Sequence, residues 1–472
     1  MHVRDQLYID GKWVDTTRKG SIDVINPATE EIIGKIPVGS SEDVDKAVAA
    51  ARSAFETWSK SDISQRIDVL NALSNAFKER GEELAQTITA EVGTPIGYSR
   101  VAMVGTPRVV SRSYAKILES FSWEEEVRNS LICKEPVGVC AFITPWNFPL
   151  HQIIGKVAPA IAAGCTMILK PSKEAPLSAF ILADILDEIG LPAGVFNLVS
   201  GHGSEIGNYM SSHPDVDMVS FTGSTGAGVS VSQSAAPTIK RVTLELGGKS
   251  ANVALDDSDP ILVAKKAIGA CHQNSGQTCS ALTRLIIPEE MNEQICEIIA
   301  AKNDSYLVGN PLDETTRCGP MVSSRQQSSV TEYIQSGINE GATLISGGLG
   351  MPDGVDKGFY VKPTIFANVT PNMRIWKEEI FGPVLVITTY KNESEALSLA
   401  NDSIYGLSGG VWSASNERAI EFAKKMRTGQ VSINGGAFNV SAPFGGYKLS
   451  GNGRELGTHG LDEFLEIKSI QM

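Results

Sequence analysis

The chain has 472 residues, more than one hydrophobic core normally supports, so we expect two or three domains. Its 41 Lys and Arg residues face 54 Asp and Glu residues, and the resulting net charge of −13 disfavours nucleic acids and anionic membranes as partners. The hydrophobic content of 42% and the charged content of 20% are typical of a soluble globular protein.

The segment from Met1 to Asp10 carries charges and no apolar stretch, so we expect no secretory signal, and the short apolar runs elsewhere predict no membrane span. The seven cysteines are irregularly spaced without a Cys-x-x-Cys, and the six histidines form no His-x-x-x-His pair. These patterns predict neither a disulfide framework nor a metal site. Reduced thiols favour a cytoplasmic location.

The first segment, through about residue 115, opens with short strands. Residues 8–13 read as a hairpin with Asp10-Gly11 as its turn. Apolar residues at helical spacing follow Ser41, which we expect to cap a helix, and a second helix is expected near residues 65–80.

The middle segment alternates short apolar runs with helical patterns. The expected strands are 139–143, 166–169, 195–199, 216–221 and 242–246, and the expected helices are 152–163, 178–189, 203–210 and 226–235. This alternation predicts a parallel sheet covered on both faces, with ligands bound at the carboxyl ends of its strands. Five of these ends carry polar, Pro or Gly residues, which we therefore expect on one rim: 144–147, 170–173, 200–201, 222–224 and Glu245.

A second alternating segment, from Ala251 to about Lys448, predicts another α/β domain. Its expected elements include a helix ending before Cys279, strands at 283–287, 384–390 and 410–412, and helices at 291–302, 393–400 and 416–426. Two pieces fit neither sheet. Residues 121–134 and 464–472 alternate polar and apolar side chains, as half-exposed strands do, and both are expected at an interface.

Cys279 lies among small, polar, turn-forming residues in Ser275-Gly276-Gln277-Thr278-Cys279-Ser280. A free cysteine is usually a packing residue, but this setting leaves the thiol reachable, as a nucleophile must be. Gly276 permits a tight backbone approach, and backbone N–H groups here could stabilise an oxyanion.

Glu245 and Asn147 are the natural partners of such a nucleophile. Glu245 ends an apolar strand and precedes Gly247-Gly248, where it is either a solvated strand-end charge or a general base for water. Asn147 lies between prolines in Pro145-Trp146-Asn147-Phe148-Pro149, where it is either a turn former or an oxyanion donor.

Three further sequence patterns are compatible with contacts to a cofactor. Residues 221–228 read as a strand, a glycine turn and a helix start, which suits phosphate binding, although their Gly-x-x-Gly-x-Gly order also fits an ordinary turn. Lys170 closes a strand before Pro171, where it is either solvated or bound to a cofactor ribose. The adjacent Glu378 and Glu379 repel unless one of them finds a donor, so a ligand contact by one is expected.

These segments together resemble the aldehyde dehydrogenase superfamily, over essentially the whole chain. Leu244-Glu245-Leu246-Gly247-Gly248-Lys249, Asn26-Pro27-Ala28-Thr29 and Pro443-Phe444-Gly445-Gly446-Tyr447-Lys448 are also similar to that family. The resemblance implies a Rossmann-like parallel-sheet cofactor-binding domain (1–117 and 137–247), an α/β catalytic domain (248–457) and a small β oligomerisation element (118–136 and 458–472). It implies a homodimer or homotetramer that takes a small aldehyde.

The resemblance also implies roles for individual residues. Cys279 is the nucleophile, Glu245 the general base, Asn147 an oxyanion donor and Lys156 part of a proton path. The aldehyde forms a thiohemiacetal and then a thioester on Cys279, and hydrolysis gives the acid. The implied contacts with NAD or NADP are Ile143, Thr144, Pro145, Trp146, Lys170, Ser172, Lys173, Gly203, Phe221, Gly223, Ser224, Thr225, Glu245, Leu246, Gly247, Glu379 and Phe381.

Two departures from the family pattern lead to hypotheses. Lys173 stands where NAD-preferring members usually carry a glutamate, so we expect NADP to be tolerated or preferred unless Lys173 points to solvent. Gly155 replaces a tunnel aromatic, so we expect a wider, mostly apolar tunnel for medium-chain aliphatic or aromatic aldehydes. The expected tunnel residues are Phe148, Gln152, Gly155, Thr278, Ser280 and Phe438.

Two alternatives remain at this stage. One is an enzyme of the same fold that transfers the acyl group to coenzyme A; such relatives generally lack a hydrolytic glutamate at the position of Glu245. The other is a non-catalytic structural relative, against which Cys279, Glu245, Asn147 and Lys170 argue together.

Overall fold

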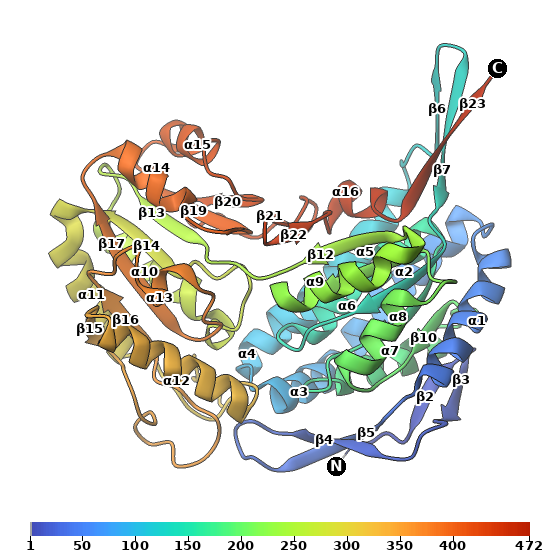
Figure 1. Cartoon of the computed structure of the whole chain (residues 1–472), viewed down its shortest axis with the longest axis horizontal. Helices are drawn as coiled ribbons and strands as arrows, with labels where there is room; N and C mark the ends of the chain where they lie inside the picture. Colours follow the sequence, from blue (N-terminus) through green and yellow to red (C-terminus); the bar gives the residue numbers. More distant parts are fainter. Residues whose placement is uncertain (1) are drawn as a thin grey trace.

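Two sheets, each covered by helices, carry most of the chain in the computed structural model, which describes residues 2–472 (Figure 1). The first sheet has the strand order β22-β12-β11-β8-β9-β10-β2-β3, and its five central strands are parallel. Its strands are β2 (Gln6–Ile9), β3 (Lys12–Asp15), β8 (Val139–Ile143), β9 (Thr166–Lys170), β10 (Phe196–Leu198), β11 (Met218–Thr222), β12 (Arg241–Glu245) and β22 (Gly451–Asn452).

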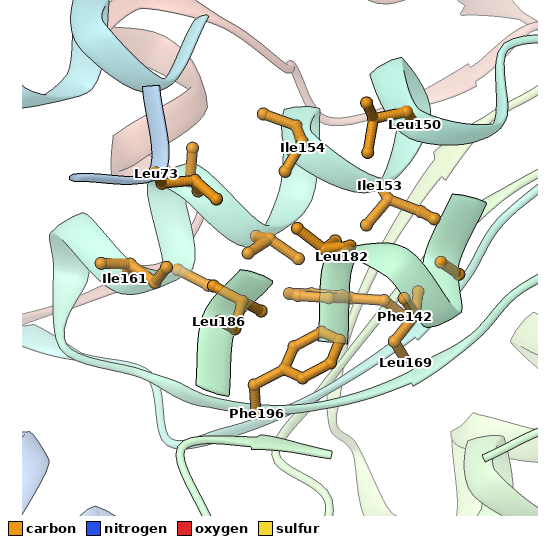
Figure 2. Packing of buried hydrophobic residues seen from close by; sticks show 14 of the residues in the cluster. Leu73, Phe142, Leu150, Ile153, Ile154, Ile161, Leu169, Leu182, Leu186 and Phe196 are labelled. Atoms are coloured by element: carbon orange, nitrogen blue, oxygen red, sulfur yellow. The ribbon is translucent and has the colours of Figure 1, made fainter. Parts of the chain in front are cut away.

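The helices of this half precede or separate the parallel strands. They are α1 (Ser41–Trp58), α2 (Ile63–Glu79), α3 (Gly81–Val92), α4 (Ile96–Tyr98), α5 (Thr106–Leu118), α6 (Pro149–Ala163), α7 (Leu177–Glu188), α8 (Asn208–Ser212) and α9 (Thr225–Ala235). Helix α6 is buried along nearly its whole length because it packs against α2 and α7 as well as the sheet. Figure 2 shows Ile153, Ile154 and Ile161 of α6 gathered with Leu73 of α2 and Leu182 and Leu186 of α7.

The second sheet has the order β15-β16-β17-β14-β13-β19-β20, with only β15 antiparallel to its neighbour among the described strands. Its strands are β13 (Ala251–Ala254), β14 (Arg284–Pro288), β15 (Thr343–Ser346), β16 (Thr364–Ala367), β17 (Val384–Tyr390), β19 (Ser408–Trp412) and β20 (Gln430–Ile433). Its helices are α10 (Pro260–His272), α11 (Asn292–Asp304), α12 (Ser324–Asn339), α13 (Arg374–Lys377), α14 (Glu393–Asn401) and α15 (Asn416–Ala423).

Three small sheets complete the fold. Strands β6 (Glu124–Val127), β7 (Ser130–Pro136) and β23 (Leu465–Gln471) form an arm that projects from the body and ends near the C-terminus (Figure 1). Short α16 (Gly457–Asp462) precedes β23. The other two sheets contain β1 (His2–Val3), β4 (Ser21–Ile25) and β5 (Ile32–Pro37), and β18 (Tyr405–Gly406) with β21 (Tyr447–Lys448).

The α/β fold class expected from the sequence is confirmed, with local corrections. Ser40, not Ser41, caps α1, because the Ser40 hydroxyl accepts from the Asp43 N–H while the Asp43 carboxylate accepts from the Ser40 N–H. The helix expected at 203–210 begins as a π-helical turn (Gly203–Gly207) and continues as α8. The single strand expected at 121–134 is the hairpin β6–β7, with Arg128 at φ 57° in its turn. Within residues 2–472, we find no helix that combines the length and apolarity a membrane span requires.

Candidate active site

The carboxyl ends of four parallel strands bring the predicted site residues to one rim of the first sheet. Asn147 follows β8, Lys170 ends β9, Thr222 ends β11 and Glu245 ends β12. Strand β8 pairs with both β9 and β11, and β11 pairs with β12, so these ends are neighbours in space. The rim predicted from the sequence is therefore present. Its residues are as much as 98 positions apart in the sequence, from Asn147 to Glu245.

The loop that carries Cys279 has an unusual backbone. Asn274, Ser275 and Gly276 lie consecutively in the left-handed region, at φ 50°, 57° and 73°. Such a run is unfavourable unless its surroundings impose it. Here the Asn274 Nδ2 donates to the Asn147 carbonyl at 2.8 Å, and the Ser275 hydroxyl donates to the Gly319 carbonyl at 3.0 Å. The loop is thus fastened to the segment of Asn147 on one side and to the segment of Gly319 on the other.

Cys279 is partly buried and packs against the edge of the first core, as Trp146 and Phe148 also do. The loop after Glu245 touches it directly, since a Cβ added to Gly248 would lie 2.6 Å from the Cys279 carbonyl oxygen. Burial raises the pKa of Cys279, and the nearby carboxylates of Glu379 and Glu245 raise it further. The thiol is therefore protonated at neutral pH in the ligand-free chain, and its attack on a carbonyl requires a base.

The Asn147 side chain is held next to the nucleophile loop. Its Nδ2 donates to the Gln277 carbonyl at 3.0 Å, two residues before Cys279. The amide has a second N–H, so one donor remains that could bind the oxygen of a carbonyl attacked by the Cys279 sulfur. The side chain is 3% exposed, which places this donor in a water-poor environment where its hydrogen bond is strong.

Both carboxylate oxygens of Glu245 are buried and have no hydrogen-bond partner within residues 2–472. Burial raises the pKa of Glu245 well above its ordinary range, and the Glu455 carboxylate raises it further, while Lys156 and Arg454 oppose the shift. An unpaired buried carboxyl with a raised pKa is the property expected of a general base.

Lys156 and Glu455 extend this acid–base group. The Lys156 ammonium is 1% exposed, forms an ion pair with Glu455 and donates to the Thr222 hydroxyl at 2.7 Å. Lys156 was predicted from the sequence, whereas Glu455 was missed. It lies 299 positions after Lys156 in a polar loop, and the pairing of β22 with β12 together with its backbone bridge to Phe444 brings it to the rim.

Among the residues expected to contact the cofactor, some have unused hydrogen-bond donors or open space beside them at the same rim. The Thr144 hydroxyl is buried without a partner among the described residues, and a Cβ added to Gly203 or Gly226 would meet nothing within 4 Å. Ser224 caps the eleven-residue α9, whose first N–H groups suit a pyrophosphate. An orphaned hydroxyl and an open glycine cradle at a helix N-terminus fit a dinucleotide.

The apolar contacts beside this cradle are tightly packed. The Phe221 ring fills the space at Gly223, where a Cβ would lie 2.6 Å away, and Leu246 does the same at Gly228 at 2.7 Å. The remaining expected contacts fall on the same strand ends and loops: Ile143, Pro145, Ser172, Thr225 and Gly247.

Glu379 and Phe381 approach the rim from the second half of the chain. The Glu379 carboxylate accepts from the Gly248 N–H at 2.9 Å, and the Phe381 ring meets Trp146 edge to face at 5.4 Å. A Cβ on Gly247 would lie 2.1 Å from a Glu379 carboxylate oxygen, so a side chain at position 247 would displace this carboxylate. Burial raises the pKa of Glu379 to about 7, against the opposing Gly248 N–H.

Lys170 and Lys173 differ in exposure. The Lys170 ammonium is buried and donates only to the Pro171 carbonyl within the described residues; burial, with Lys173 nearby, lowers its pKa to about 8. The Lys173 side chain is 47% exposed and lies 3.4 Å from the Glu174 carboxylate. Glu174 follows the position where a glutamate was expected in NAD-preferring relatives, and it partly neutralises Lys173.

The whole chain matches known proteins. Residues 13–470 match the model of the aldehyde dehydrogenase family. A 3-succinoylsemialdehyde-pyridine dehydrogenase from a Pseudomonas species is 49% identical over 468 residues, covering 98% of each chain. An aldehyde dehydrogenase C mutant from Pseudomonas syringae, solved with NAD+ and octanal, is 46% identical with a TM-score of 0.98, covering 99% of this chain and 96% of that one. An aldehyde dehydrogenase from Mycobacterium tuberculosis, solved with NAD+, is 40% identical with a TM-score of 0.97, covering 100% and 98%.

The chain belongs to the aldehyde dehydrogenase family. It is an oxidoreductase that converts aldehydes to carboxylic acids with NAD or NADP, and the resemblance found in the sequence is confirmed.

The expected tunnel residues of this aldehyde dehydrogenase divide into two groups. Ser280 and Phe438 line an open cavity of about 700 Å³ next to the nucleophile loop. Gln152 is buried, and the Thr278 hydroxyl donates to the Gln273 carbonyl at 3.2 Å, so neither of these two side chains lines that cavity. The space beside Gly155 is not empty, because a Cβ there would lie 3.2 Å from a Glu455 carboxylate oxygen.

Aromatic rings connect the tunnel positions that remain. Phe148 meets Tyr98 at 6.3 Å and His151 at 6.4 Å, and His151 meets Phe438 at 6.4 Å, all edge to face. His151 was missed from the sequence, although it lies one helical turn before Gly155 on α6 and so shares its face.

Proposed function

We propose that this aldehyde dehydrogenase works through Cys279, Glu245 and Asn147, with Lys156 and Glu455 moving protons. The single observation that carries the proposal is Glu245: a buried, unpaired carboxyl beside the nucleophile loop has no structural task that would offset its burial. In this account Glu245 takes the proton of the Cys279 thiol, and the thiolate attacks the aldehyde carbon.

The second half of the reaction uses the same groups. The free N–H of Asn147 and the Cys279 backbone N–H hold the oxyanion of the thiohemiacetal. Bound NAD or NADP supplies the hydride acceptor. The Glu455 carboxylate of the Lys156–Glu455 pair first takes the thiol proton from Glu245 and passes it on to solvent. Glu245, again unprotonated, then removes a proton from the water that attacks the resulting thioester, and this second proton leaves by the same route while the Cys279 thiolate is released.

We infer that the cofactor lies along the ends of β8, β9 and β11. Thr144, Lys170 and the N-terminus of α9 would hold its polar groups, and Glu379 and Phe381 would contact its nicotinamide half. The exposed Lys173 supports tolerance of NADP, since a lysine pairs with a 2′-phosphate but accepts no hydrogen bond from a ribose hydroxyl.

We propose medium-chain aliphatic or aromatic aldehydes as substrates. The aromatic rings at Phe148 and Phe438 and the neighbouring cavity support an apolar tail. One relative's structure contains octanal, and another is named for an aldehyde that carries a pyridine ring, which is consistent with this range. Acetaldehyde is expected to have a lower kcat/KM than octanal.

The test is initial rates of reduced-cofactor formation across an aldehyde panel, with NAD and NADP in parallel. The account predicts turnover that disappears in Cys279→Ala, while a Cys296→Ala variant on α11 keeps it. Turnover only in the presence of coenzyme A would overturn the assigned role of Glu245. Turnover that survives in Cys279→Ala would overturn the nucleophile.

We further infer a cytoplasmic homo-oligomer, with 1–117 and 137–247, 248–457, and 118–136 with 458–472 as its three domains. The separate sheet of the β6–β7–β23 arm supports the third, and its exposed apolar side chains support its use in assembly: Val127, Ile467, Ile470 and Met472. Ile467→Asp is expected to lower the mass measured by light scattering, while Ile404→Asp, at another exposed isoleucine elsewhere (58% against 71% exposed), leaves it unchanged.

A further inference from the structure

His151 occupies a position in the aromatic wall where an apolar residue would pack as well. It is the third residue of α6, and its ring lies between Phe148, which follows Asn147, and Phe438, which lines the cavity beside Cys279. The ring is only partly buried. His151 therefore contacts Phe438, a residue that lines the cavity we propose for the substrate tail.

The imidazole has no hydrogen bond within residues 2–472. Its Nδ1 is fully enclosed and unpartnered, whereas Nε2 is not enclosed. Burial lowers the pKa of His151 to about 4, with Lys156 lowering it and Glu455 opposing, so the ring is neutral at pH 7. A neutral imidazole carries one N–H and one lone pair.

The enclosed position selects the tautomer. A buried N–H without a partner is less tolerated than a buried lone pair, so the enclosed Nδ1 carries the lone pair and Nε2 carries the hydrogen. The accessible edge of the ring thus presents a single N–H donor in an otherwise aromatic wall.

We propose that His151 is a specificity-determining residue that donates a hydrogen bond from Nε2 to an acceptor atom in the substrate tail. The inference rests on the proposed function and adds a substrate class: aldehydes whose tail contains a ring nitrogen or a carbonyl oxygen. A hydrocarbon tail of equal size would leave this donor unpaired, and the site would discriminate against it.

The experiment compares isosteric aldehydes that differ by one acceptor atom. Benzaldehyde is paired with the 2-, 3- and 4-pyridinecarboxaldehydes, and octanal with 4-oxooctanal, and kcat/KM is measured for wild type, His151→Leu and His151→Gln. Because intrinsic reactivity differs within each pair, the readout is the change of the acceptor-to-hydrocarbon ratio between variants. We expect His151→Leu to lower that ratio roughly fivefold to tenfold for at least one acceptor position, the value of one neutral hydrogen bond.

The controls separate this role from packing. His151→Gln, which keeps an N–H donor, should restore part of the ratio. Phe438→Leu should change kcat/KM by the same factor for the two aldehydes of each pair. His459→Leu, at an exposed position on α16, should leave the acceptor-to-hydrocarbon ratios unchanged. If His151→Leu lowers kcat/KM equally for the acceptor-containing and the hydrocarbon aldehyde of each pair, the inference is overturned and the proposed function stays intact. Absence of turnover on every aldehyde in wild type would instead overturn the proposed function.

Discussion

The backbones of Gly276 and Gly382 approach so closely that a Cβ on Gly276 would lie 2.1 Å from the Gly382 carbonyl oxygen. Gly276 belongs to the loop of Cys279, the proposed nucleophile, and Gly382 follows Phe381 in the segment that we propose contacts the cofactor. The contact therefore fixes the nucleophile loop to the cofactor segment without any side chain. Since Gly276 also has φ 73°, the position excludes other residues on two independent grounds.

Gly276→Ala is expected to reduce kcat by at least about 100-fold, because a displacement of the loop by even 1 Å misplaces the nucleophile. Cofactor binding, measured by fluorescence titration, should weaken as well, because Phe381 is adjacent. Gly81→Ala, at the start of α3 where a Cβ would make only an ordinary 3.7 Å contact with Val104, is the matched control. It should keep activity and stabilise the fold by about 0.5–1 kcal/mol. Equal activity in the two variants would contradict the rigid contact.

Glu455→Gln should move the acid limb of the kcat–pH profile to lower pH. The Glu455 carboxylate raises the pKa of Glu245, so its neutralisation lowers that pKa and ionises the base at lower pH. The plateau rate should fall about tenfold to 100-fold, because the ion pair with Lys156 is lost. Glu466→Gln, at the exposed end of an ion pair with Arg241, should change neither property. An unmoved acid limb in Glu455→Gln would show that Glu245 does not limit the rate there.

Lys173→Glu should shift cofactor preference from NADP toward NAD. The ratio of kcat/KM for NADP to that for NAD is expected to fall about tenfold or more, as the loss of one charge-assisted hydrogen bond predicts. Lys60→Glu, an exposed lysine far along the chain from the rim, controls for the change in net charge. An unchanged ratio in Lys173→Glu would mean that the lysine points to solvent and takes no part in binding.

Glu91→Gln should flatten the dependence of thermal stability on pH. Glu91 of α3 is 0% exposed and accepts from the Leu177 and Ser178 N–H groups at the start of α7; burial raises its pKa to about 7, against these two hydrogen bonds. Its folded pKa exceeds its unfolded pKa, so its contribution to stability is complete below about pH 4.3 and is lost as the pH rises through 7.

The measurement is Tm between pH 5 and pH 8. The Tm of Glu91→Gln should lie below that of wild type, and the difference in Tm should become smaller as pH rises. The corresponding difference in the free energy of unfolding should change by at most about 1.4 kcal/mol per pH unit. Glu79→Gln, at an exposed position on α2, should differ from wild type in Tm by the same amount at every pH. A Glu91→Gln deficit that stays constant would mean that Glu91 is ionised throughout.

The parallel strands of the first sheet could be predicted from the sequence because each is a short apolar run between helical patterns. In the second sheet β14, β17 and β19 were expected, whereas β13, β16 and β20 were missed. Strands β8 and β17 match the expected residues at both ends. Several short elements carry no such signal, among them β22, which has two residues and exists only because Leu244 and Glu245 pair with it. Ser41 was mistaken for the cap because Ser40 and Ser41 are chemically equivalent, and only the position of Asp43 relative to each decides.

The site could be predicted where chemistry and strand ends coincide, as for Cys279, Glu245 and Asn147. Glu455 and His151 escaped for a different reason. Glu455 reaches Lys156 across 299 positions, so no local pattern links the two. His151 can be recognised as a candidate only from its contacts with the rings of Phe148 and Phe438, and Phe438 is distant in the sequence.

The most direct test of the central claim is intact-protein mass spectrometry of Glu245→Gln after mixing with octanal and NAD. This variant should form the Cys279 thioester slowly, because the thiol has lost its base, and should fail to hydrolyse it. On prolonged incubation it should therefore accumulate one octanoyl group per chain. Peptide mapping should place that group on Cys279, and it should be absent from the Cys279→Ala, Glu245→Gln double variant. Rapid formation of reduced cofactor without any acyl adduct, or an adduct on another residue, would contradict the account.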